Sequence, residues 1–297
     1  MTSAFIAGDW GTSHLRLFLC GADDEILDQR TGPGIATTRG ASADVFLSLA
    51  QAWYDQQPDL PAILCGMVGS TIGWHEVPYL PCPAPITGLA RAATRFEVSG
   101  HEIVLVPGMS CRNPLAAPDM MRGEETQIFG ALRQQPALTQ GRHLLCLPGT
   151  HAKWALVENG GVTRFLTAVT GELFELLVRH SILVKGGVTA SPKQAVALPA
   201  SDASPLHRLF EARSRQLAGE FSPEQASAYL SALIIGEDVS GALRLFPGFA
   251  AVTVIGGGDL PARYAEALQA RSVEARTIDG GEAVLAGLCA LHQEMFA

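Results

Sequence analysis

Short apolar segments alternate with turn residues at the start of the chain, and this pattern predicts a β-meander. Residues 5–7 are apolar, the glycine-containing residues 8–12 follow them, and residues 15–19 are largely apolar again. Residues 21–24 have turn chemistry, and a third strand is expected from residue 25 onward. We therefore expect three antiparallel strands at the N-terminus.

A second segment near the middle of the chain repeats this pattern. Turn residues at 148–151 and 158–161 separate three apolar segments, and a helix-compatible segment follows from residue 172. The three expected strands are residues 144–147, 154–157 and 162–166. The first turn of each meander contains a Gly-Thr pair, which makes the two segments alike in more than their hydrophobicity.

The two Gly-Thr turns suggest an internal duplication, because Thr12 and Thr150 lie about half a chain apart. We expect a duplicated α/β domain that divides near residue 135, with lobes at 1–135 and 136–297. The closing helix can pack back on the first lobe. Two unrelated hairpins in one sheet would explain the pattern equally well.

The rest of the chain alternates between strand and helix patterns, which indicates the α/β class. Buried strands that run into glycine are expected at residues 62–66, 103–108 and 251–256. Ser222 to Gln225 has the composition of a helix start, and residues 282–296 predict a closing helix. Residues 186–222, rich in Pro, Ser and Ala, are expected to form an insertion or an irregular connector.

Composition and charge narrow the function classes. The 297 residues carry a formal net charge of −8, which argues against nucleic-acid binding and against a polybasic membrane binder. No apolar run approaches the roughly 20 residues of a membrane span, and the N-terminus lacks the basic region of a signal peptide. The six cysteines include no CxxC pair, as is typical of a reducing compartment. We therefore expect a soluble, cytoplasmic protein.

The first turn has the residues of a phosphate site. Asp9 ends a buried strand, where its carboxylate is suited to hold Mg²⁺ directly or through water. The backbone around Gly11 and the hydroxyls of Thr12 and Ser13 can donate to phosphate oxygens. A plain Asp-Gly hairpin is the structural alternative.

The second turn has similar chemistry. Gly149 and Thr150 form the turn, and Lys153 follows it in a chain that contains only three lysines. Its compact ammonium is suited to a phosphate, although a surface lysine on a strand is an equally good interpretation.

Two adjacent glutamates, Glu124 and Glu125, open a predicted helix between the two turns. One of them can accept the proton of a substrate hydroxyl, as phosphoryl transfer requires. Stabilisation of negative charge by the helix dipole explains such a pair without catalysis.

The common nucleotide-binding motifs do not occur. The chain has no Gly-Lys dipeptide, which excludes a Walker loop, and Pro261 occupies the third glycine position of a Rossmann fingerprint after Gly256 to Gly258. That glycine turn can instead admit a planar ligand close to the backbone. A nucleotide must therefore bind through another architecture.

The order of these features resembles the superfamily of actin, heat-shock chaperones and sugar kinases, whose members have two ribonuclease H-like (actin-like ATPase) domains around a central cleft. The local sequences are similar to the 2-dehydro-3-deoxygalactonokinase family in five collinear blocks: residues 8–16, 65–79, 121–127, 147–154 and 170–173. The similarity spans most of the chain and is weakest across residues 186–222.

The resemblance implies an ATP-dependent kinase that phosphorylates the 6-hydroxyl of 2-dehydro-3-deoxy-D-galactonate and releases ADP, in galactonate or galactose breakdown. Asp9 would anchor Mg²⁺, and Glu124 or Glu125 would be the catalytic base. Lys153 would be a further catalytic residue, at the second phosphate turn. The residues that would bind ATP are Asp9, Gly11, Thr12, Ser13, Gly149, Thr150, Gly256, Gly257 and Gly258.

The implied substrate is an anion, for which arginine is the expected partner. The residues that would contact it are Arg16, Ser70, Trp74, Glu76 and Arg122, each with surface pairing or core packing as its alternative. Sugar binding would draw the lobes together and exclude water from the reaction.

Three other functions fit the same features. They are a kinase of another sugar acid, a polyphosphate or nucleotide phosphohydrolase of the same superfamily, and a non-catalytic sensor. In each case the expected partners are small anions, without nucleic acid or membrane. The oligomeric state is left open, a homodimer included.

Overall fold

The computed structural model describes residues 4–186 and 203–296, so most of the predicted connector's first half lies outside the described residues. Contacts group the chain into two compact units. Unit 1 comprises Met1–His143, Ala155–Phe165 and Ile278–Ala297, and unit 2 comprises Leu144–Trp154 and Leu166–Thr277. The division near residue 135 stays a prediction.

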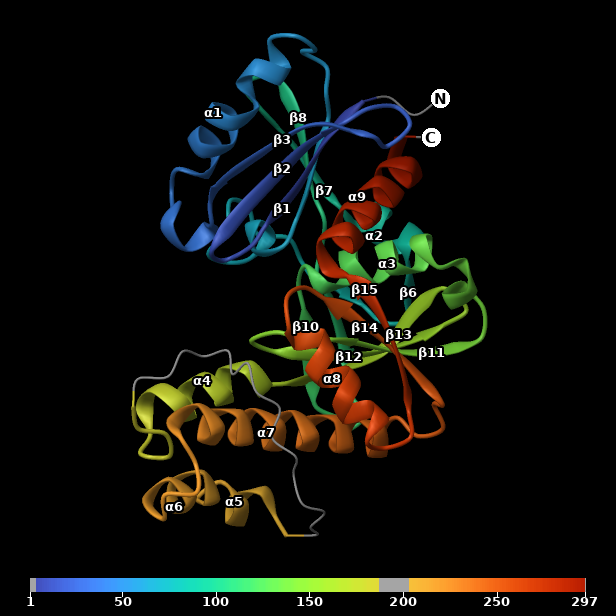
Figure 1. Ribbon diagram of the computed structural model, residues 1–297. Helices are drawn as coiled ribbons and strands as arrows, with labels where there is room; N and C mark the ends of the chain where they lie inside the picture. Colours follow the sequence, from blue (N-terminus) through green and yellow to red (C-terminus); the bar gives the residue numbers. More distant parts are fainter. Residues whose placement is uncertain (1–3, 187–202, 297) are drawn as a thin grey trace. The chain divides into compact units, whose positions relative to one another are not determined.

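The predicted strands and helices are present (Figure 1). The strands are β1 (Phe5–Trp10), β2 (His14–Cys20), β3 (Ile26–Pro33), β4 (Ala62–Cys65), β5 (Leu80–Pro81), β6 (Ala84–Pro85), β7 (Thr94–Val98), β8 (His101–Leu105), β9 (Met109–Arg112), β10 (Pro118–Met121), β11 (Arg142–Leu147), β12 (Ala152–Glu158), β13 (Gly161–Ala168), β14 (Ala251–Gly256) and β15 (Glu274–Asp279). The α-helices are α1 (Ser42–Tyr54), α2 (Ile86–Ala92), α3 (Glu124–Gln134), α4 (Thr170–His180), α5 (Pro205–Arg208), α6 (Glu211–Leu217), α7 (Pro223–Leu245), α8 (Leu260–Gln269) and α9 (Gly280–Phe296).

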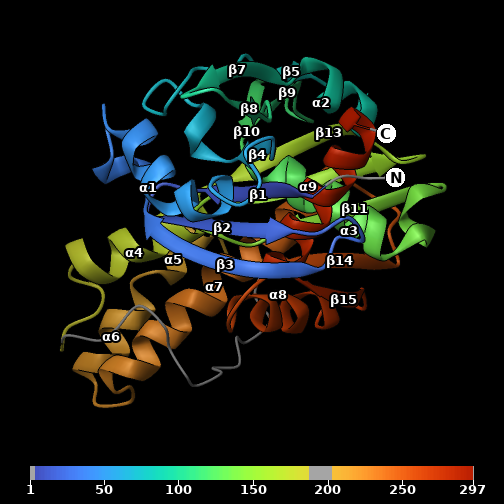
Figure 2. The ribbon, with the colours of Figure 1, turned by 90° about the horizontal axis from the view of Figure 1, so that it is seen from above.

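The main sheet of unit 1 has the strand order β3-β2-β1-β4-β8-β7. β1 and β2 form the predicted hairpin, in which Asp9 lies opposite Arg16, and β3 continues it on the outer side, as Figure 2 shows. β4 pairs with β1 in parallel, with Asp9 in register with Cys65. Because parallel strands end at the same edge of a sheet, the ends of β1 and β4 place their following residues together.

A second sheet repeats this order, with strands β15-β14-β11-β12-β13-β6. The first meander and its parallel neighbours, β3-β2-β1-β4-β8, thus recur as β13-β12-β11-β14-β15. Within unit 2, Cys146 on β11 is in parallel register with Val254 on β14. The turns that follow these two strands, at 148–151 and 256–259, therefore belong to one edge. The recurrence confirms the predicted fold class of two ribonuclease H-like α/β parts.

Helices α3 and α9 of unit 1 pack backbone against backbone, and two glycines allow this close approach. A Cβ atom on Gly130 would lie 1.7 Å from the carbonyl oxygen of Ala283, and one on Gly287 would lie 2.0 Å from that of Thr126. No side chain fits at either position, so the backbones are in direct contact. This contact supports α3 close to its first turn, where the two predicted glutamates lie.

Unit 2 contains α7, the 23-residue helix that begins where the sequence predicts. Gln225 donates its backbone N–H to Ser222 Oγ at 3.2 Å, and the Gln225 side chain accepts the Ser222 N–H at 2.8 Å. This capping box satisfies two backbone groups at the helix start. Of the helices that the structure describes, α7 included, none combines the length and apolarity needed to cross a membrane.

Candidate active site

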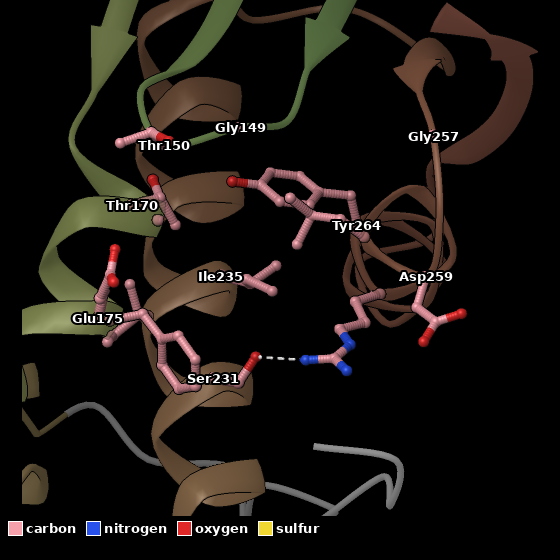
Figure 3. A pocket seen from close by; sticks show the side chains of 14 residues that line it. Gly149, Thr150, Thr170, Glu175, Ser231, Ile235, Gly257, Asp259 and Tyr264 are labelled. Atoms are coloured by element: carbon pink, nitrogen blue, oxygen red, sulfur yellow. Dashed lines mark hydrogen bonds between the residues drawn. The ribbon is translucent and has the colours of Figure 1, made fainter. Parts of the chain in front are cut away.

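A cavity of about 330 Å³ lies within unit 2 (Figure 3). Its wall comes from the β11–β12 turn, the first turns of α4, the middle of α7 and the start of α8. The residues that line it are Gly149, Thr150, Thr170, Gly171, Phe174, Glu175, Ser231, Ile234, Ile235, Gly257, Asp259, Leu260, Arg263 and Tyr264. An apolar floor with a few polar groups at its rim is typical of a nucleoside-sized ligand site.

The β11–β12 turn is held against the start of α4. A Cβ atom on Gly171 would lie 2.4 Å from the carbonyl oxygen of Gly149, so only glycine allows this approach. The backbone N–H of Glu172 donates to the carbonyl oxygen of Thr150 at 2.9 Å. The predicted phosphate turn thus lies at a helix N-terminus, where the helix dipole favours negative charge.

Only part of the predicted ATP site lines this cavity. Gly149, Thr150 and Gly257 do, whereas Gly256 and Gly258 belong to the same turn without lining it. Lys153 on β12 is 6% exposed, and its ammonium donates to Thr167 Oγ1 at 2.8 Å. The predicted lysine is therefore a buried, hydrogen-bonded residue rather than one exposed on a strand surface.

Most of the cavity wall was missed by sequence analysis. The side chains from α4, α7 and α8 are ordinary helix residues, and one pair among them is hydrogen-bonded, since Arg263 Nη1 donates to Ser231 Oγ at 3.1 Å. The glycine turn after β14, which leads into α8, was the available signal for this wall.

Unit 1 brings the first turn and the two glutamates together. The Arg16 guanidinium binds the Asp9 carboxylate at 2.5 Å. A Cβ atom on Gly66, which follows β4, would lie 3.5 Å from Asp9 Oδ1, and one on Gly123 would lie 3.4 Å from the Gly66 Cα. The residue before Glu124 therefore packs on the strand end beside Asp9. Thr12 and Ser13 are exposed in the adjacent turn, next to the half-buried Gly11.

The two glutamates have different surroundings. Glu125 is 0% exposed, both of its carboxylate oxygens accept the Gly123 N–H, at 2.9 and 2.7 Å, and Thr126 Oγ1 donates to it at 3.1 Å. Burial, with the negative charge of Glu124 adding to it, raises the pKa of Glu125 to about 8. Glu124 is the first residue of α3, is partly exposed and accepts the Arg122 N–H at 3.0 Å. A ligand can reach Glu124 but not Glu125.

The raised pKa of Glu125 predicts a pH-dependent stability. The pKa in the unfolded chain is near 4.5 and that in the folded chain is about 8, so the folded state binds this proton more tightly. The resulting stabilisation is complete below the lower value and is lost as the pH rises through the higher one. We expect the free energy of unfolding of the wild type to fall across this window relative to that of Glu125→Gln, which cannot titrate. Urea unfolding of both proteins at a series of pH values measures this, and parallel pH profiles would contradict it.

The predicted substrate residues of unit 1 differ in how they are placed. Ser70 Oγ donates to the Met67 carbonyl oxygen at 2.7 Å, and Glu76 is exposed. Trp74 packs in an aromatic cluster, with its ring 5.6 Å from that of Phe46. Trp74 is partly exposed beside this cluster, and the roles of Ser70, Trp74 and Glu76 toward a substrate stay predictions.

Arg122 is the exception, because part of its guanidinium has no partner. Nη2 donates to the Val77 carbonyl oxygen at 2.7 Å, and the group lies 4.3 Å above the ring of Tyr79. Nε and Nη1 are buried and make no hydrogen bond to the residues that the structure describes. A Cβ atom on Gly69 would lie 2.9 Å from Nη1, so the guanidinium packs closely against this glycine. Unpaired buried donors of a charged group are costly unless a partner satisfies them.

Comparison with known proteins agrees with these features. The family model described as 2-keto-3-deoxy-galactonokinase matches residues 9–291. The chain is 36% identical over 302 residues to the probable 2-dehydro-3-deoxygalactonokinase of Rhizobium meliloti, covering 98% of this chain and 97% of the relative. It is 33% identical over 298 residues to the 2-dehydro-3-deoxygalactonokinase of Escherichia coli, covering 97% of each chain.

Solved structures give the same result. A crystal structure from Sinorhizobium meliloti, described as a putative 2-dehydro-3-deoxygalactonokinase, superposes with a TM-score of 0.86 at 33% identity and covers 98% of this chain and 99% of its own. The activator of 2-hydroxyisocaproyl-CoA dehydratase from Clostridium difficile shares the fold, with a TM-score of 0.53 at 14% identity over 98% of this chain and 95% of its own. The chain therefore belongs to the 2-keto-3-deoxy-galactonokinase family and is a kinase with the actin-like fold.

Proposed function

We propose that the protein transfers the γ-phosphoryl group of ATP to the 6-hydroxyl of 2-dehydro-3-deoxy-D-galactonate, giving the 6-phosphate and ADP in galactonate breakdown in the cytoplasm. The observation that carries the proposal is the segment from Arg122 to Glu124. Within three residues it offers unpaired guanidinium donors and a reachable carboxylate. The guanidinium can bind the carboxylate of a sugar acid, and the Glu124 carboxylate can accept the proton of an alcohol.

The ATP nucleoside would occupy the cavity of unit 2. Gly149 and Thr150 would bind phosphate oxygens at the start of α4, and Gly257 would border the nucleoside, with Gly256 and Gly258 shaping the turn that carries it. Lys153 would exchange its bond to Thr167 for a phosphate oxygen. Gly11, Thr12 and Ser13 would donate to phosphate from the other Gly-Thr turn.

The residues fit Mg²⁺ as an ion that arrives with ATP. Among the described residues, no group of three or more His, Cys, Asp or Glu side chains could hold a metal. Mg²⁺ in phosphoryl-transfer enzymes needs only one or two carboxylates, because phosphates and water complete its coordination. Asp9 would supply that carboxylate, and the ion would neutralise phosphate charge when bound.

The chemistry of the chain's own residues then follows. Arg122 would hold the carboxylate of the acid by a charge-assisted hydrogen bond from its guanidinium, which orients the far end of the molecule. Glu124 would take the proton of the 6-hydroxyl as its oxygen bonds to the γ-phosphorus and the bond to ADP breaks. Arg16 would keep the Asp9 carboxylate oriented. Ser70, Trp74 and Glu76 remain candidates for contacts with the sugar.

Coupled ADP release from purified protein with a panel of sugar acids tests the proposal. We expect turnover with ATP, Mg²⁺ and 2-dehydro-3-deoxy-D-galactonate, and slower turnover with its epimer. Turnover with another sugar acid alone would mean that the protein is a kinase with a different substrate. Phosphate release from polyphosphate in the absence of any sugar would indicate a phosphohydrolase instead of a kinase.

A further inference from the structure

A partly buried carboxylate that the proposed mechanism does not use joins three elements around the cavity of unit 2. Asp238 on α7 accepts hydrogen bonds from Trp154 Nε1 on β12 at 2.8 Å, Thr170 Oγ1 on α4 at 2.8 Å and Tyr264 OH on α8 at 2.6 Å. All three donors are neutral. Burial raises the pKa of Asp238, and the three hydrogen bonds oppose that rise.

Two of these donors, Thr170 and Tyr264, line the cavity. Figure 3 shows the Tyr264 hydroxyl pointing towards Thr170 across the cavity. Both hydroxyls bond to the same oxygen of Asp238, Oδ2, and an ionised carboxylate only accepts. Each hydroxyl has a single hydrogen, so its remaining capacity consists of lone pairs. Toward a ligand in the cavity, both side chains can only accept.

We propose that Asp238 is a positioning residue that fixes Thr170 and Tyr264 as hydrogen-bond acceptors and thereby makes the cavity select a nucleoside through its donor groups. Those donors are the ribose hydroxyls or the exocyclic amine of adenine. The inference rests on the proposed function, because it requires a nucleotide in this cavity. Asp238 itself does not touch the ligand and acts through the two hydroxyls.

Replacement by asparagine tests this polarity because an amide cannot reproduce it. With its oxygen at the position of Oδ2, the amide directs its NH₂ at the Trp154 N–H. With its NH₂ at that position, the amide donates to the two hydroxyls and reverses them into donors. Asp238→Asn therefore changes either the packing beside Trp154 or the hydrogen-bonding polarity of the cavity.

Steady-state kinetics of Asp238→Asn and of its neighbour Glu237→Gln provide the experiment. Glu237→Gln removes the same charge from the same helix without touching Thr170 or Tyr264, and it should behave as the wild type. For Asp238→Asn we expect the KM for ATP to rise about tenfold, which corresponds to the loss of one to two hydrogen bonds. The KM for the sugar acid should stay unchanged.

The second readout is nucleotide preference, which a merely structural role would not change. The wild type should prefer ATP over 2′-deoxy-ATP, 3′-deoxy-ATP or inosine triphosphate by about tenfold, and the analogue that shows the difference identifies the donor. Asp238→Asn should lose that preference, and so should Tyr264→Phe or Thr170→Val if the asparagine variant does not fold.

Three results would overturn the inference. If Asp238→Asn lowers the melting temperature but keeps the KM for ATP and the nucleotide preference of the wild type, Asp238 has only a structural role. If Tyr264→Phe and Thr170→Val both keep the nucleotide preference, the two hydroxyls do not bind the nucleoside selectively. A wild type that binds no ATP by calorimetry would overturn the proposed function itself, and the inference with it.

Discussion

Glu124→Gln is expected to lower kcat by about a thousandfold while leaving the KM for ATP near its wild-type value, because removal of a general base typically costs about 10²- to 10⁴-fold. The amide keeps an oxygen that can accept the Arg122 N–H, so the start of α3 is preserved. What it loses is the capacity to take a proton. Coupled ADP release with saturating ATP and sugar acid measures the effect.

Glu224→Gln is the matched control for this variant. Glu224 also lies in the first turn of a helix, α7, where it accepts a hydrogen bond from Ser222 Oγ on the protein surface. It should leave kcat unchanged. If Glu124→Gln retained wild-type turnover, the base would have to be another group, and the exposure of Glu124 would need a different explanation.

The strands and the helix starts could be predicted from the sequence because their determinants are local. Apolar segments ending in glycine predict β1, β4, β11 and β14, and Ser222 with Gln225 predicts the start of α7. The repeated strand order follows from two similar meanders.

The difference between Glu124 and Glu125 could not be predicted in this way. It depends on the turn at Gly123, whose φ of 105° directs its N–H at both oxygens of Glu125. A helical pattern places both glutamates in the first turn without saying which one the core encloses. The sequence therefore predicts the pair of glutamates, and the backbone conformation determines that Glu125 is buried while Glu124 is partly exposed.

The wall of the cavity in unit 2 could not be predicted either, for a different reason. Asp238 is 84 residues from Trp154, 68 from Thr170 and 26 from Tyr264, and the sequence blocks that contain Trp154 and Thr170 do not indicate that these residues meet at Asp238. Their contact depends on how three helices pack around one turn. The packing of Trp74 against Phe46 could not be predicted either, and its contact with the sugar stays a prediction.

Arg122→Met is expected to raise the KM for the sugar acid about a hundredfold while the KM for ATP stays near its wild-type value. A charge-assisted hydrogen bond contributes about 1.5–3 kcal/mol, and the bond to the carboxylate would be lost. The variant also loses the hydrogen bond from Nη2 to the Val77 carbonyl oxygen, which lowers its stability, while methionine keeps an apolar contact with Tyr79. Arg122→Lys should recover only part of the affinity, since a lysine lacks the fork.

The amide of the sugar acid separates this role from a structural one. The wild type should discriminate strongly against the neutral amide, because Arg122 would then lose its anionic partner in a buried position. Arg122→Met should accept acid and amide about equally. Arg112→Met, which removes an exposed arginine of the same unit whose Nη1 donates to the Ala116 carbonyl oxygen, should keep the discrimination of the wild type. If Arg122→Met still preferred the acid, its carboxylate would have to bind elsewhere, and the unpaired donors of Arg122 would serve another anion.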